Sequence, residues 1–175
     1  MDYELNPRTR IGHVHLTVAN LDKALAFYRD MLGFQVTARF GTNAVFLSSG
    51  NYHHHIGLNT WAGENATPAP VGHTGLYHFA ILYPSREDLA KAFKRIWESN
   101  YPLEGASDHG VSKSIYIKDP DGNGLELYCD KLVEQWPKDE DGNGHDQDDG
   151  GLGREGRLQV AHGPDDHAEP RRQED

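Results

Sequence analysis

The same order of strand and helix signals occurs twice in the first 136 residues of this chain. In each half, a run of alternating apolar and polar residues leads into a capped amphipathic segment, and further alternating runs follow. The histidines near the two starts repeat as well. His13 precedes Phe27 of the first helical segment by 14 residues, and His78 precedes Phe93 of the second by 15. This pattern predicts a duplicated β-α-β-β-β unit.

The repeat predicts an α+β fold. Two βαβββ modules, residues 10–66 and 75–131, would form one domain over residues 1–136, with a curved mixed sheet as an open, barrel-like cup around a metal site. Asn20 would cap the first helix and Gly33 would end it, while Ser85-x-x-Asp88 is a capping box for the second. The second helix is expected to bury Leu89, Ala92, Phe93, Ile96 and Trp97. Strands are expected at 10–18, 34–40, 44–49, 54–61, 76–83, 112–118 and 125–130, with a weaker one near 103–106.

Charge is distributed unevenly along the chain. Residues 137–175 contain 12 Asp and Glu, 5 Lys and Arg, and seven glycines, so most of the formal charge of −10 lies there. This composition predicts an acidic, glycine-rich, disordered tail. The remaining body has no basic patch, which argues against nucleic acid as a partner.

The compartment can also be predicted from the sequence. The chain has a single cysteine, Cys129, and no run approaches the 18 apolar residues of a membrane span. No signal peptide is recognisable at the start of the printed sequence. We therefore expect a cytoplasmic protein with no membrane association and no internal disulfide.

Strand alternation selects the candidate site residues. Each helix must cover one face of its sheet, which leaves the other face open to a ligand. The polar side chains expected on the open faces are His13, His55, His78, Tyr116 and Glu126. Alternation also predicts that His54 points to the face opposite His55, and the repeat places His55 where the second half has Glu126.

These residue types favour a metal centre. A single histidine on a strand is more often structural than a ligand, but five such positions on one expected face reverse that judgement. Two imidazoles and one carboxylate can occupy one face of an octahedron, an arrangement that suits Fe(II) enzymes which bind substrate and O2 together. His13, His78 and Glu126 form the natural ligand set, and Mn(II) is the alternative metal.

Several separated motifs resemble the vicinal oxygen chelate superfamily, which includes glyoxalases, bleomycin-resistance proteins and extradiol dioxygenases. They are the opening Gly12-His13-Val14-His15-Leu16, the two modules, and the ending that runs from Asp119 to Tyr128. The strand with the three histidines and the segment from Asp108 to Ser112 are similar to the catechol 2,3-dioxygenase-like branch. The resemblance covers about residues 10–131.

The resemblance implies roles for individual residues. His13, His78 and Glu126 match iron ligands, His55 matches an acid–base histidine, and Tyr116 matches a hydrogen-bonding tyrosine. His109 lies in the loop that supplies a further substrate-contacting histidine, although its spacing to Tyr116 is shorter than usual. The implied reaction is Fe(II)-dependent extradiol cleavage of a catechol by O2, in a protein expected to form a homodimer.

Two other functions are compatible with the sequence. A glyoxalase-type isomerase or a metal-dependent thiol transferase would need a fourth protein ligand, and His55 could supply it. A non-catalytic protein that binds a small molecule such as a drug is the second alternative, although such proteins commonly lack the ligand set.

Overall fold

The computed structural model describes residues 3–63, 66–70 and 72–138. The first module begins with β1 (Val14–Thr17) and α1 (Leu21–Leu25), and the helix continues as a π-helical segment, η1 (Ala26–Met31). The strands β2 (Gln35–Phe40), β3 (Ala44–Ser48) and β4 (Ile56–Asn59) follow. Asn20 caps α1 by accepting a hydrogen bond from the backbone N–H of Lys23.

The second module repeats this order. It contains β5 (His78–Leu82), α2 (Arg86–Glu98), β6 (Gly105–Asp108), β7 (Ser112–Lys118) and β8 (Gly124–Asp130), and a short 3-10 turn, η2 (Val133–Gln135), follows it. Ser85 caps α2 through the N–H of Asp88, as the capping box predicts. The repeated β-α-β-β-β order is thus confirmed.

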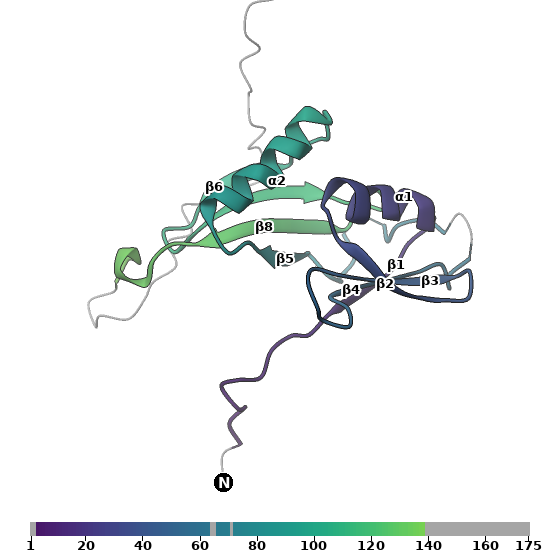
Figure 1. Ribbon diagram of the computed structural model, residues 1–175, viewed down its shortest axis with the longest axis horizontal. Helices are drawn as coiled ribbons and strands as arrows, with labels where there is room; N and C mark the ends of the chain where they lie inside the picture. The colour runs from purple at the N-terminus through teal and green to yellow at the C-terminus, as the bar shows by residue number, and fades with distance from the viewer. Residues whose placement is uncertain (1–2, 64–65, 71, 139–175) are drawn as a thin grey trace, which may run out of the picture.

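The two modules form two separate four-stranded sheets with the same internal order. The first sheet has the order β1-β4-β3-β2, and the second has the order β5-β8-β7-β6. In each, the outer strand before the helix pairs parallel with the last strand of the module, and the other neighbours are antiparallel. Figure 1 shows α1 and α2 on one side of the sheets, while the N-terminal segment leaves on the other. Each sheet therefore has a helix-covered face and an open face, which confirms the α+β class.

The core lies between the sheets and their helices. It contains apolar side chains from both modules, among them Leu25, Leu58, Ile96, Leu127 and the cysteine at position 129. Burying these side chains is the main favourable contribution to the free energy of folding.

A buried polar contact joins the two modules. The Tyr28 hydroxyl donates to Asp119 Oδ2 at 2.8 Å, and Asp119 closes the turn between β7 and β8 by accepting from the backbone N–H groups of Asp121 and Asn123. Burial and the neighbouring Asp119 carboxylate raise the pKa of Tyr28, so its hydroxyl remains a donor.

The structure corrects the sequence prediction in the burial of the second helix and in the starts of two strands. The helix α2 buries Leu89 and Ile96, but Phe93 and Trp97 are 36% and 48% exposed and pack against each other with ring centroids 5.9 Å apart. Because they are four residues apart on one helical face, their side chains contact each other. The strands β1 and β4 also begin later than expected, at Val14 and Ile56, so His13 and the histidine run each precede their strand.

The acidic tail from Asp139 onward lies outside the described residues. Within the part of the chain that the structure describes, no helix is long and apolar enough to cross a membrane.

Candidate active site

The Glu126 carboxylate is the centre of a hydrogen-bonded group on the open face of the second sheet. Its Oε1 accepts from the Ser114 hydroxyl at 2.6 Å and from the Tyr116 hydroxyl at 3.0 Å. Its Oε2 lies 3.1 Å from His78 Nε2. One oxygen of the carboxylate is thus held by two hydroxyls, while the other faces an imidazole nitrogen.

His109 extends this group. Its Nε2 lies 2.6 Å from the Tyr116 hydroxyl and 4.0 Å from Glu126 Oε1, and its side chain is largely buried. Because the Tyr116 hydroxyl donates to Glu126, a protonated Nε2 of His109 would donate to Tyr116 and complete a chain of donors ending at the carboxylate. The arrangement can hold a proton and transfer it among groups within hydrogen-bond distance.

Strand register brings these side chains together. Tyr116 pairs with Glu126 across β7 and β8, and Glu126 pairs with Ala80 across β8 and β5. His78 lies two residues before Ala80 on the same face of β5, and Ser114 lies two residues before Tyr116 on β7. Alternation in three adjacent strands therefore places four polar side chains on one surface.

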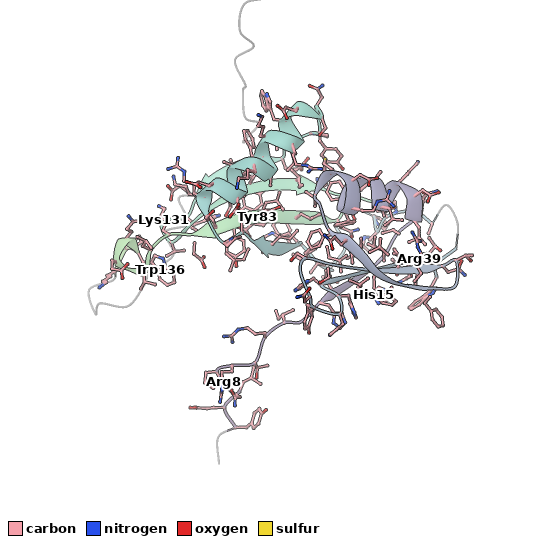
Figure 2. The ribbon with its side chains drawn as sticks, viewed as in Figure 1. Arg8, His15, Arg39, Tyr83, Lys131 and Trp136 are labelled. Atoms are coloured by element: carbon pink, nitrogen blue, oxygen red, sulfur yellow. The ribbon has the colours of Figure 1, made fainter. Side chains whose placement is uncertain are left out.

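The turn that carries His109 is held by ionic contacts at its base. Asp108, the last residue of β6, accepts from the Gly110 N–H at 3.0 Å, from Lys113 Nζ at 2.9 Å, and from Lys131 Nζ just beyond β8. The hydrogen bonds from Lys131, Lys113 and Gly110 hold the pKa of Asp108 well below its usual range. Lys131 lies at the end of the second sheet in Figure 2. These contacts tie the His109 turn to the strand that carries Glu126.

The first sheet gathers histidine rings instead. The ring centroids of His13 and His54 are 4.5 Å apart, and His53 Nδ1 lies 2.7 Å from His54 Nδ1. His55 Nδ1 lies 2.9 Å from the buried Ser48 hydroxyl, and the His55 ring is tilted against that of Tyr52 with the centroids 4.9 Å apart. Burial, and then the neighbouring imidazoles of His13 and His53, lower the pKa of His54.

The prediction that His54 points away from His55 is wrong. The His54 ring packs 4.9 Å from Phe46, an open-face residue of β3, and 4.5 Å from His13. The reason is that strict alternation holds only within a paired strand, and residues 52–55 form a bend before β4 begins. The backbone there turns both imidazoles toward the open face.

The equivalence of His55 and Glu126 is also wrong. The two helix caps, Asn20 and Ser85, each follow their module's histidine by seven residues, so His13 and His78 correspond. His15 and Ala80, two residues after these histidines, therefore correspond as well. Gly57 pairs with His15 and Glu126 pairs with Ala80, so the residue of the first sheet that corresponds to Glu126 is Gly57.

The structure brings together some of the predicted site residues and separates others. The contacts of His78, Glu126, Tyr116 and His109 all belong to the second module, whereas His13 and His55 lie just before β1 and β4 of the first. Among the described residues, no group of three or more His, Cys, Asp and Glu is arranged to hold a metal ion within one copy. The donor types of His78 and Glu126 fit Fe(II) or Mn(II), and they supply two ligands of the predicted three.

Sequence reasoning missed a role for Ser114. It lies on the predicted open face of its strand, but a serine carries no sequence signal of its own, and only the structure shows its hydroxyl against Glu126. A possible signal was its position two residues before Tyr116 in the strand that pairs with β8.

Comparisons with known proteins assign the chain to a family. The sequence model of the Glyoxalase/Bleomycin resistance protein/Dioxygenase superfamily matches residues 10–127, so the chain belongs to this superfamily. A structural relative is the lactoylglutathione lyase from Agrobacterium tumefaciens, with 26% identity and a TM-score of 0.56 over 71% of this chain and 96% of that one.

The curated relatives include dioxygenases. The chain is 42% identical over 113 residues to "Catechol-2,3-dioxygenase" of Bacillus subtilis, covering 64% of this chain and 38% of that protein. It is 32% identical over 127 residues to "Biphenyl-2,3-diol 1,2-dioxygenase 3" of Rhodococcus globerulus, covering 71% of this chain and 65% of that protein. The matched region thus spans between about two fifths and two thirds of the length of these relatives.

Proposed function

We propose that this protein is a metal-dependent extradiol dioxygenase, which opens the ring of a catechol beside its two hydroxyl groups with O2. The observation that carries the proposal is the group around Glu126, in which an imidazole and a carboxylate lie 3.1 Å apart beside a tyrosine and a second histidine. The similarity to catechol- and biphenyldiol-cleaving relatives supports it. We also propose that the protein acts in the cytoplasm.

His78 and Glu126 would hold Fe(II), with Mn(II) as the alternative. The bound metal would supply Lewis acidity, lower the pKa values of the catechol hydroxyls, and orient substrate and O2 on one centre. Glu126 offers Oε2 for this purpose, because Ser114 and Tyr116 already engage Oε1.

Tyr116 and His109 would act on the substrate oxygens. The Tyr116 hydroxyl, which donates to Glu126 Oε1, would instead donate a hydrogen bond to a substrate oxygen on which negative charge develops. His109 Nε2 lies 2.6 Å from that hydroxyl, so it would supply a proton to Tyr116 whenever Tyr116 passes its own proton to the substrate oxygen. His55 would serve as the acid–base group, because imidazole is the side chain that most readily exchanges a proton near neutral pH.

The third ligand, His13, would come from a second copy of the chain. The open face of the first sheet carries His13, and the open face of the second carries His78 and Glu126. A two-fold homodimer that lays the first sheet of each copy over the second sheet of the other would form two identical sites. Each site would then hold the three ligands His13, His78 and Glu126, with His55 as the acid–base group.

Complementation tests this composite site. His13→Ala and Glu126→Ala would each fail to bind iron when pure. In a dimer of one copy of each, co-expressed with two affinity tags, one site would carry both substitutions and the other would carry neither. We therefore expect such mixed dimers to bind about half the iron of the wild type and to regain turnover. Failure of the mixed dimer to regain iron would contradict the composite site.

The reaction itself can be tested directly. The protein would be loaded with Fe(II) under anaerobic conditions and then given catechol and air, while O2 consumption and the yellow ring-cleavage product are followed. Turnover with both signals would support the dioxygenase. Activity on other substrates with Ni(II) or Zn(II) and no O2 consumption would support the glyoxalase-type alternative. Stoichiometric binding without turnover would support the non-catalytic one.

A further inference from the structure

The imidazole of His55 is held through its Nδ1 atom. Nδ1 lies 2.9 Å from the Ser48 hydroxyl and accepts a hydrogen bond from the backbone N–H of Ser49 at 3.4 Å. A backbone N–H can only donate, so Nδ1 carries a lone pair and not a proton when the ring is neutral. The proton of the neutral ring is therefore on Nε2.

The hydroxyl of Ser48 consequently donates to Nδ1. Its other acceptor, the Ser49 carbonyl oxygen, is farther away, at 3.4 Å. The opposite assignment, with a proton on Nδ1 that points at the hydroxyl, would direct this proton and the Ser49 N–H toward each other. When both groups donate to Nδ1 this conflict is absent, and the hydroxyl makes the shorter of the two bonds.

Strand register brings Ser48 beside His55. Leu47 pairs with Ile56 across β3 and β4, so the next pair in the same register is Ser48 with His55. The backbone N–H of His55 donates to the Leu47 carbonyl at 2.8 Å, which extends the ladder just beyond β4. Side chains directly opposite each other in this way share one face of the sheet. Ser48 is completely buried, so its hydroxyl is shielded from solvent and bonds to the imidazole instead.

The other ring nitrogen of His55 is accessible to a ligand. Within the described residues, both hydrogen bonds of this ring are made by Nδ1, and no buried side-chain nitrogen or oxygen lacks a partner. Nε2 is therefore not buried. The ring of Tyr52 lies against the imidazole, with the centroids 4.9 Å apart and the planes at 37°. A ring held at one nitrogen and packed against a neighbour directs its other nitrogen along a defined line.

We propose that Ser48 is a positioning residue for His55, whose hydroxyl fixes the imidazole so that Nε2 donates a hydrogen bond to an oxygen of the ligand. The inference rests on the proposed function, because it deepens the acid–base role of His55. A neutral imidazole with its proton on Nε2 can donate at that atom but cannot accept a proton there. His55 would consequently stabilise negative charge on an oxygen, and would not remove the proton of a catechol hydroxyl.

Nuclear magnetic resonance of the ring nitrogens tests the proposal without any requirement for turnover. The full-length, metal-free protein would be labelled with nitrogen-15 histidine and measured at about pH 9, above the range in which unperturbed imidazoles are protonated. The signals of His55 are those that disappear in His55→Gln. We expect a protonated Nε2, and an Nδ1 whose signal moves toward that of an unbonded lone-pair nitrogen in Ser48→Ala. A proton on Nδ1 in the wild type, or an unchanged Nδ1 signal in Ser48→Ala, would overturn the proposal.

Turnover of the iron-loaded protein provides the second arm. Ser48→Ala should lower kcat for catechol about 3- to 10-fold and leave KM unchanged, because Ser48 contacts His55 and not the diol. Ser48→Thr keeps a hydroxyl at this position and should restore most of kcat. Ser112→Ala, which removes a buried hydroxyl from the second sheet, is the matched control and should change neither constant. A loss of kcat that Ser48→Thr does not restore, or a rise in KM alone, would contradict the positioning role.

The two arms separate this inference from the proposed function. If catechol is not cleaved but the Nδ1 signal responds to Ser48→Ala, Ser48 still positions the His55 ring and the dioxygenase proposal fails. If catechol is cleaved and neither the Nδ1 signal nor kcat responds to Ser48→Ala, the dioxygenase proposal stands and the positioning role is overturned.

Discussion

The two modules share a scaffold, but their open faces differ in chemistry. At corresponding positions the first sheet has His15, Gly57 and Phe46, and the second has Ala80, Glu126 and Tyr116. The second sheet presents a carboxylate surrounded by donors, whereas the first presents rings. Duplication of one unit thus provides two surfaces, of which one carries a carboxylate with its hydrogen-bond donors and the other carries imidazole and phenyl rings.

The proposed metal centre would need both faces. A carboxylate and an imidazole on the second sheet supply only part of a three-ligand centre, and the histidine that would complete it lies on the first. Different faces of a duplicated fold can diverge freely as long as the buried apolar residues of each strand stay in place.

The largest expected effect is on iron binding and turnover, and it distinguishes a metal ligand, Glu126, from a proton carrier, His55. Glu126→Ala should abolish iron binding, because it removes a ligand from the second sheet. His55→Ala should keep the iron and lower turnover 10²- to 10⁴-fold, since it removes an acid–base group from the first. Iron analysis and O2 uptake measure the two effects. Equal loss of iron in both variants would mean that His55 is a ligand.

The next largest effect is on the free energy of unfolding, and it compares two glycines, Gly57 and Gly124, that each lie close to a neighbouring strand. A Cβ at Gly124 would collide with the Tyr77 carbonyl, whereas a Cβ at Gly57 would meet the movable His15 ring. We expect Gly124→Ala to lower the free energy of unfolding by about 3 kcal/mol and Gly57→Ala by about 1 kcal/mol. Urea denaturation gives both values, and a larger effect at Gly57 would contradict this view of the first sheet.

A smaller effect should follow from loss of the hydroxyl beside Glu126. Ser114→Ala would remove the shorter of the two hydrogen bonds to Oε1 and should weaken iron affinity about 10- to 100-fold, measured by competition with a chelator. Ser112→Ala is the matched control, being a buried serine two residues earlier on the same strand. Similar affinities for the two variants would show that the Ser114 bond does not position Glu126.

The smallest effect concerns the ionic contacts at the base of the His109 turn. Lys131 and Lys113 lower the pKa of Asp108, so their stabilisation is present above the usual aspartate pKa near 4 and disappears as pH falls through the lowered value. Asp108→Asn should therefore cost less than about 1 kcal/mol at pH 7, because the side chain is nearly half exposed, and less still in high salt. A cost independent of both salt and pH would indicate a role other than charge.

The local elements could be predicted well, and the reasons are physical. Asn20 and Ser85 cap their helices because each side chain satisfies a free backbone N–H, and this depends only on neighbours in sequence. Alternation correctly assigned His78, Tyr116 and Glu126 to one face, because these residues lie within paired strands or at their starts. Alternation failed at His54, which lies in a bend before β4. The helical apolar stripe failed at Phe93 and Trp97, which contact each other and stay partly exposed.

By itself, the sequence determined the repeat, the strand faces and the kinds of chemistry available, because periodicity and residue type act over a few neighbouring residues. Only the tertiary structure decided which candidates meet. Strand pairing placed Ser114, Tyr116 and His78 around Glu126, set Gly57 opposite His15, and left His13 on a different sheet. Such contacts depend on register between distant segments, which side-chain packing in the shared core sets and local sequence does not encode.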